Sequence, residues 1–263
     1  MSVSAVTLPH MTASDDFTAP QRCIDWCRAQ DWARLVLDET VTVDMDKWNR
    51  TLHELGVATV VRGRDADGKP TGAGLAHLQR ADLTPTSELI DPSDPHRSLV
   101  YQCAAWLSGH RVRRPSNPVP RLPHRTEGKP GSPGAMVDTF LRECERDHGG
   151  LIGGDGGWLA SPGIGMKLRA TVMWAYEAHT VGGREARLVD QFGVNTLIRH
   201  GWLDTPVVSA FTPRRYDSYV GALEDWAYEA GTDPDLVEMW LVREWRLRLS
   251  RAQGRPRDHD VLF

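Results

Sequence analysis

The stretch SPGIGMKLRA, residues 161–170, places a proline and two glycines directly before a lysine and the start of a helical pattern. Gly163 and Gly165 allow positive φ and a close approach of the backbone, and Pro162 restrains the chain where it enters the turn. The first N–H groups of the following helix lack intrahelical partners, so together with the helix dipole they favour an anion such as a phosphate. Lys167 lies in that first turn, where the dipole disfavours a protonated amine, and a neutral amine is a nucleophile. The stretch is typical either of a plain turn with an exposed lysine or of a phosphate-binding turn that presents an amine.

Outward from this turn, apolar side chains recur mostly at helical spacing. Residues 57–81 differ, because a β-branched run, a DADGKP turn and a second short run predict a β-hairpin. The predicted fold class is therefore mainly α, with an N-terminal α+β portion that contains a short β-hairpin. The expected helices cover residues 18–38, 46–56, 95–112, 134–150, 157–179 with the turn in their middle, 189–203, 214–231 and 233–252.

A proline-rich stretch at residues 113–134 is the best candidate for a boundary within the 263 residues. It predicts a linker or long loop between a mixed region, residues 1–112, and an almost wholly helical region, residues 135–263. We expect the first region to pack against the helices of the second.

Composition bounds the class of protein. A content of 40% hydrophobic and 25% charged residues is that of an ordinary globular protein, and no stretch has the apolar length of a membrane span or the pattern of a secretory signal. We therefore expect a cytoplasmic monomer. The four cysteines have no redox or metal-binding spacing, which indicates buried thiols. The net charge of −4 argues weakly against nucleic acid, but two basic stretches, 110–129 and 243–257, stand out locally.

Residues 159–172 resemble the hairpin of the helix-hairpin-helix DNA glycosylase superfamily, whose pattern is L-P-G-[IV]-G-x-K-x-A-x-x-[IV]. The shared positions are Pro162, Gly163, Ile164, Gly165 and Lys167. Upstream, MVDTFLRECERDHGG resembles the helix that ends in glycine before the family's hairpin. Downstream, Val189-Asp190 matches the Val-Asp that opens a helix and carries the catalytic aspartate. The tail, from residue 219, resembles bacterial proteins like 8-oxoguanine DNA glycosylase, and the resemblance covers about residues 134–250.

This chain departs from the family pattern in three places. Ser161 replaces the usual leucine, a few extra residues separate Lys167 from Asp190, and Gln-Phe follows the aspartate in place of Thr-His or Val-His. An aspartate at the start of an apolar helix is also the usual N-cap, so Asp190 alone would be read as a cap. Together with the hairpin, a catalytic role is favoured.

The resemblance implies cleavage of an N-glycosidic bond in double-stranded DNA, with the target base flipped into a pocket. The amides of Gly163, Ile164 and Gly165 would hold a phosphate. Lys167 would attack C1′ and form a Schiff base, which also implies AP lyase activity, and Asp190 would assist. No metal or organic cofactor is implied. Trp240 and Trp245, beside the arginines of the last helix, are candidates for stacking on the base.

Two other functions stay open at this stage. Many helix-hairpin-helix units only grip phosphates, so a non-catalytic DNA-binding protein is one alternative, and the pair Lys167 and Asp190 speaks against it. The other is a glycosylase that acts on hypermodified bases of invading phage DNA rather than on oxidised purines in repair. The sequence does not decide which base is removed.

Overall fold

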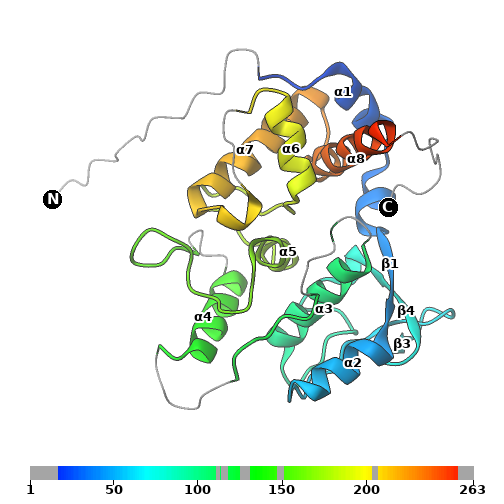
Figure 1. Ribbon diagram of the computed structural model, residues 1–263, viewed down its shortest axis with the longest axis vertical. Coiled ribbons are helices and arrows are strands. Elements are labelled where there is room, and N and C mark those ends of the chain that lie inside the picture. Colours follow the sequence, from blue (N-terminus) through cyan, green and yellow to red (C-terminus); the bar gives the residue numbers. More distant parts are fainter. Residues whose placement is uncertain are drawn as a thin grey trace.

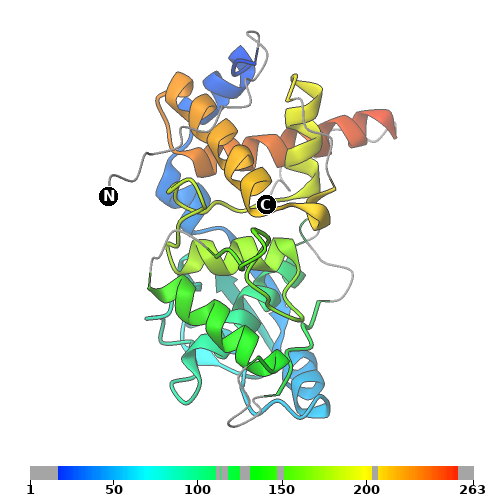
Figure 2. The same cartoon turned by 90° about the vertical axis from the view of Figure 1, so that its left-hand side faces the viewer.

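The computed structural model describes residues 17–110, 113, 118–124, 131–146, 151–202 and 207–253. Their elements form two lobes, with helix α5 (Met166–Ala175) between them (Figures 1 and 2). The sheet lobe contains the β-strands and helices α2, α3 and α4, and the helical lobe contains α1, α6, α7 and α8 (Figure 1). In the described part of the chain, no helix has the length and apolar character needed to cross a membrane.

The sheet lobe is built on four antiparallel strands in the order β1-β4-β2-β3. Strands β2 (Gly63–Arg64) and β3 (Pro70–Thr71) flank the DADGKP turn, which confirms the predicted hairpin. Strand β4 (Leu75–Gln79) pairs along its whole length with β1 (Thr40–Asp44). The β1 strand was not predicted, although its sequence TVTVD alternates between exposed threonine and buried valine.

Helices cover this sheet and connect it to the rest of the chain. α2 (Met45–Glu54) starts at Asp44, whose carboxylate accepts a hydrogen bond from the Lys47 N–H. α3 (Pro95–Gly109) is buried from Arg97 to Leu107 and contacts β1, α4 and α5. α4 (Pro133–Glu145) lies within the helix predicted at 134–150 apart from its first residue, and it begins at a Ser132 cap.

The helical lobe brings together the two ends of the described chain. α1 (Gln21–Arg28) packs against α7 (Pro213–Ala230) and α8 (Pro234–Ala252), and α6 (Gln191–Arg199) also packs on α8. The Ala19 N–H donates to Glu229 Oε2 at 2.9 Å, and Arg28 Nε donates to the Ala230 carbonyl at 2.8 Å. α8 begins at an Asp233 cap, since the Asp233 carboxylate accepts from the Asp235 N–H at 2.8 Å. All four cysteines are buried and form no disulfide bond, as expected.

Buried ion pairs tie the two lobes together. Arg80, directly after β4, donates to Asp235 on α8 at 2.8 Å, and both side chains are almost fully buried. Arg113 makes a bidentate pair with Glu238 on α8, at 2.7 and 2.8 Å. The first basic stretch therefore includes one arginine that belongs to the interior rather than to a DNA-binding surface. A buried charge needs such a partner, because its desolvation is costly.

Two predictions about the chain's organisation have different outcomes. The first half of the predicted helix–turn–helix at 157–179 is wrong, because residues 151–160 form an extended loop with a bridge between Ile152 and Trp158. Glycines at 153, 154, 156 and 157 favour such a loop over a helix. The division into 1–112, a linker at 113–134 and 135–263 stays a prediction, and residues 111–112, 114–117 and 125–130 of that region lie outside the described residues.

Candidate active site

The glycine turn of residues 161–165 leads directly into α5. Its exposed positions are Gly163 and Gly165, which alternate with the buried side chains of Ser161, Ile164 and Met166. Gly165 is the N-cap residue of α5, and no side chain caps this helix end. The first turn of α5 therefore presents backbone donors beside an exposed glycine backbone, an arrangement that favours an anion.

Gly163 is fixed by its surroundings. Its φ is +86°, and a Cβ at this position would lie 2.5 Å from the carbonyl oxygen of Arg121. Segment 118–124 of the proline-rich stretch thus packs against the turn. Arg97 of α3 holds the segment in place, because its Nη1 donates to the Pro123 carbonyl at 2.7 Å.

We expect Gly163→Ala to lower the free energy of unfolding by at least about 1–2 kcal/mol, because an L side chain at positive φ is strained and its Cβ would push segment 118–124 away. Urea denaturation measures the change. Gly165→Ala is the matched control, since its φ is −74° and the space around its Cβ is open. Equal losses for the two variants would contradict this account of the turn.

Lys167, in the first turn of α5, contacts Asp190, which caps α6 of the helical lobe. Lys167 Nζ lies 2.6 Å from Asp190 Oδ2, and the two residues are 23 positions apart in the chain. The lysine side chain is 27% exposed, whereas that of the aspartate is 2% exposed. The amine is therefore reachable from outside while its carboxylate partner is buried behind it.

Asp190 uses its two carboxylate oxygens for different tasks. Oδ1 accepts from the Phe192 N–H at 2.8 Å and caps α6, and Oδ2 accepts from Lys167. The aspartate is thus both the helix cap and the partner of the lysine. Because the cap fixes the carboxylate relative to the backbone of α6, Oδ2 is held toward the amine.

Two buried tyrosines of α7 hold the chain just before Asp190. Tyr216 Oη accepts from the Arg187 N–H at 3.0 Å and donates to the Arg187 carbonyl at 2.5 Å. Tyr219 Oη donates to the Leu188 carbonyl at 3.1 Å. Burial raises the pKa of Tyr216 above its ordinary value, so the hydroxyl stays a hydrogen-bond donor. The position of Asp190 is therefore set by α7 as well as by its own helix.

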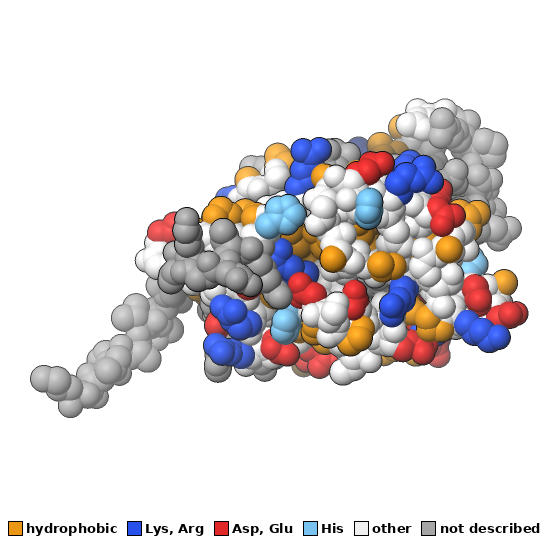
Figure 3. All heavy atoms as spheres, turned by 90° about the horizontal axis from the view of Figure 1, so that it is seen from below, with side chains coloured by type: hydrophobic (Ala, Val, Ile, Leu, Met, Phe, Trp, Pro, Cys, Tyr) orange, Lys and Arg blue, Asp and Glu red, His pale blue; other side chains and the backbone are white. Residues whose placement is uncertain are grey.

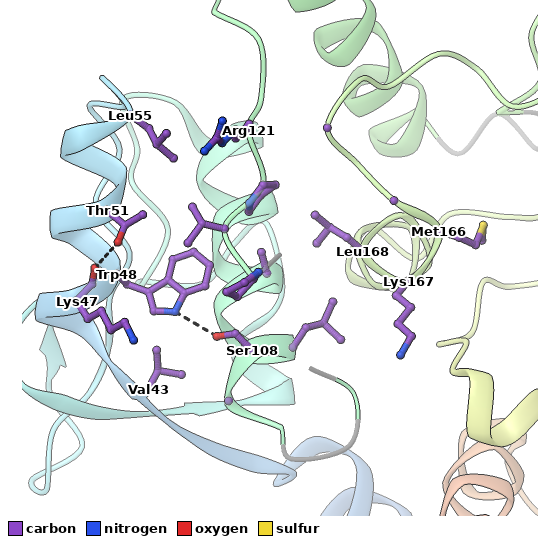
Figure 4. A pocket seen from close by; sticks show the side chains of 18 of the residues that line it. Val43, Lys47, Trp48, Thr51, Leu55, Ser108, Arg121, Met166, Lys167 and Leu168 are labelled. Atoms are coloured by element: carbon purple, nitrogen blue, oxygen red, sulfur yellow. Dashed lines mark hydrogen bonds between the residues drawn. The ribbon is translucent and has the colours of Figure 1, made fainter. Parts of the chain in front are cut away.

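The glycine turn and Lys167 border a cleft of about 1310 Å³ between the two lobes. Figure 4 shows Lys47 and Trp48 of α2 on one side, Met166, Lys167 and Leu168 of α5 on the other, and Arg121 between them. The helical lobe adds Gln191 and residues 207–209 to the lining. The cleft combines apolar walls with hydroxyl, amide and cationic groups, which suits a ligand that is partly apolar and partly polar.

The structure places three other predicted site residues away from the cleft. The Ile164 side chain is buried, and its N–H donates to the Ser161 carbonyl at 3.0 Å, so this amide is engaged within the turn. Trp240 is 1% exposed and packs against Trp226, with ring centroids 6.2 Å apart. Trp245 is half-buried and lies under Arg248 on α8. This geometry does not favour the phosphate role predicted for Ile164 or the base-stacking role predicted for Trp240 and Trp245, and these roles stay predictions.

Three cleft residues were not singled out from the sequence. Trp48 was read as part of an amphipathic helix, and its Nε1 donates to Ser108 Oγ at 3.1 Å at the cleft wall. Gln191 was noted only as a departure from the family pattern, although its place directly after Asp190 was a usable signal. Arg121 was one arginine of a basic stretch, and only the packing of its backbone on Gly163 sets it apart.

Figure 3 shows the face of the sheet lobe that is seen from below. In Figure 3 its described basic and acidic side chains are interspersed. The cleft brings the glycine turn together with a buried acid and a reachable amine.

The glycine turn before α5 and the lysine–aspartate pair at the interlobe cleft are the arrangement that the resemblance to DNA glycosylases predicts. The chain belongs to the family described as "Putative 8-oxoguanine DNA glycosylase OGG-like protein", whose model matches residues 34–242. The match includes Lys167 and Asp190 and extends the resemblance, first placed at 134–250, back to the start of the sheet lobe. No curated protein and no solved structure gives a significant match.

Proposed function

We propose that this protein removes an oxidised purine, 8-oxoguanine, from double-stranded DNA through a covalent intermediate on Lys167. The single observation that carries the proposal is the 2.6 Å contact between the reachable Lys167 amine and the buried Asp190 carboxylate. A protein that only binds DNA phosphates needs neither the amine nor the carboxylate in this place, so the pair favours an enzyme over a binding module.

The DNA backbone is held first. The exposed backbone of Gly163 and Gly165 and the uncapped first turn of α5 would bind one phosphate beside the target nucleotide. These contacts read no sequence and serve to place the sugar near Lys167. The base cannot be reached inside the helical stack, so it is flipped into the cleft, where stacking and polar groups select it.

The chemical step begins with a proton transfer from the Lys167 ammonium to Asp190, which leaves a neutral amine. The amine nitrogen attacks C1′, and the bond between C1′ and the base nitrogen breaks, with its electron pair leaving on the base, which takes up a proton. Opening of the sugar ring then gives a Schiff base between Lys167 and C1′. Asp190 stabilises the positive charge that develops on the sugar.

The same intermediate accounts for an AP lyase activity. Water takes a proton from C2′, the electron pair forms the C2′–C3′ double bond, and the bond between C3′ and its phosphate oxygen breaks, so that the phosphate leaves as the anion. Water then hydrolyses the Schiff base and regenerates the Lys167 amine. Strand cleavage therefore follows from the lysine mechanism without a further catalytic group.

Borohydride trapping on duplexes that carry different bases tests the proposal. We expect base release and a trapped protein–DNA adduct on an 8-oxoguanine duplex and neither on the undamaged duplex. Glucosylated hydroxymethylcytosine DNA is a separate arm, and release there alone would assign the enzyme to modified phage DNA. DNA binding without release or an adduct on any substrate would reduce the protein to a binding module.

A further inference from the structure

Arg169 is a buried cation directly beneath the glycine turn. It lies on α5 and is 7% exposed, and its guanidinium stacks between the rings of Phe140 and Trp158, 4.8 Å from each centroid. The side chain runs back toward the turn, where Nη1 donates to the Leu159 carbonyl at 3.2 Å and Nη2 donates to Ser161 Oγ at 2.5 Å.

No carboxylate in the described part of the chain pairs with this guanidinium, and its partners are two neutral oxygens and two aromatic rings. The other buried arginines differ in this respect. Arg97 pairs with Asp138 at 3.0 Å, and Arg80 and Arg113 pair with acids of α8. Burial lowers the pKa of Arg169 to about 10, so it keeps its charge at neutral pH.

An unpaired buried charge costs stability, and a protein core tolerates it where something else compensates the charge. The exposed anion site lies on the other side of the same turn, at Gly163 and Gly165. The field of Arg169 crosses protein rather than water, so it is screened less than that of a surface charge. It therefore adds to the helix dipole at the place where a phosphate would bind.

We propose that Arg169 is a positioning residue of the DNA-phosphate site, whose buried charge is compensated by a backbone phosphate on the glycine turn. The inference rests on the proposed DNA binding and adds a residue that does not touch the ligand. The side chain does two things at once: its hydrogen bonds to residues 159 and 161 hold the turn, and its charge attracts the anion.

The test compares neutral and charged replacements. Arg169→Met and Arg169→Gln remove the charge, and we expect each to weaken binding of undamaged duplex DNA about tenfold at low salt. Arg169→Lys keeps the charge but loses the stacking geometry, and we expect its affinity to stay within about threefold of the wild type. Fluorescence anisotropy over a salt series measures the affinities.

Stability separates this role from a merely structural one. Arg169→Met loses two hydrogen bonds as well as the charge, so its unfolding temperature is measured, and we expect the weaker DNA binding to persist at a temperature where the variant is fully folded. Arg64→Met is the control, since it removes the ion pair with the buried Asp82 carboxylate in the sheet lobe, away from the cleft lining, and should lower the unfolding temperature while the folded protein binds DNA normally.

The outcomes are distinct. Wild-type affinity in both neutral variants would overturn the inference, as would a neutral variant that loses stability and retains DNA binding when folded. Loss of affinity in Arg169→Lys equal to that in Arg169→Met would also overturn it, because affinity would then not follow charge. If the wild-type protein itself bound no DNA, the proposed function would fail instead.

Discussion

Lys167→Ala is expected to abolish borohydride trapping and to lower the rate of base release by at least about 10³-fold, because it removes the only group proposed to form a bond to C1′. The variant also leaves the buried Asp190 carboxylate without this ion-pair partner, so we expect some loss of stability, and thermal unfolding is measured to confirm that the assayed protein is folded. Single-turnover base release and adduct formation on the same duplex give the two readouts.

Lys47 offers a matched control for that experiment. It is a lysine of the same cleft, on α2 across from α5 (Figure 4). We expect Lys47→Ala to keep the adduct and to change base release only through DNA affinity. An adduct that persists in Lys167→Ala, or one that disappears in Lys47→Ala, would assign the nucleophile elsewhere.

Asp190→Asn is expected to slow base release about 10²- to 10⁴-fold with little loss of stability. Asparagine caps a helix as well as aspartate does, so the bond to the Phe192 N–H can persist. The carboxylate that takes the proton from Lys167 and stabilises the sugar cation is lost. A stopped-flow or quench assay at saturating enzyme measures the chemical step apart from DNA binding.

Asp190→Ala separates the two tasks of this side chain. It removes both the cap and the carboxylate, so we expect a similar loss of activity and an additional loss of about 1 kcal/mol in the free energy of unfolding. Near-wild-type activity in Asp190→Asn would reduce the aspartate to a cap.

The sequence predicted the local features of the candidate site better than its surroundings. The glycines, Lys167 and Asp190 could be assigned because each depends on a short pattern: a positive φ, a helix start and a cap. Their approach to 2.6 Å could not be derived from spacing, since it depends on how α7 holds the chain before Asp190. The family resemblance supplied that expectation.

The errors arose where tertiary packing decides exposure. Residues 235–242 of α8 are all buried, so this part of the helix has no face left for DNA, and Trp240 is in the core. An amphipathic pattern does not show that a helix is enclosed on every side. Arg113 was counted with a basic stretch for the same reason, because its acidic partner lies 125 positions away in the chain.

The packing of α1 on α7 and α8 has a consequence during synthesis. The bond between Ala19 and Glu229 spans 210 positions of the chain. At about 5–20 residues per second, the ribosome needs roughly 10–40 s to deliver the partners of the first helix. The strands and α3 are synthesised long before that, so the sheet lobe can assemble on the ribosome. During this time the apolar face of α1 stays exposed to solvent, because α7 and α8 have not yet been made. The helical lobe, and with it the cleft, is completed only after α8 has been synthesised.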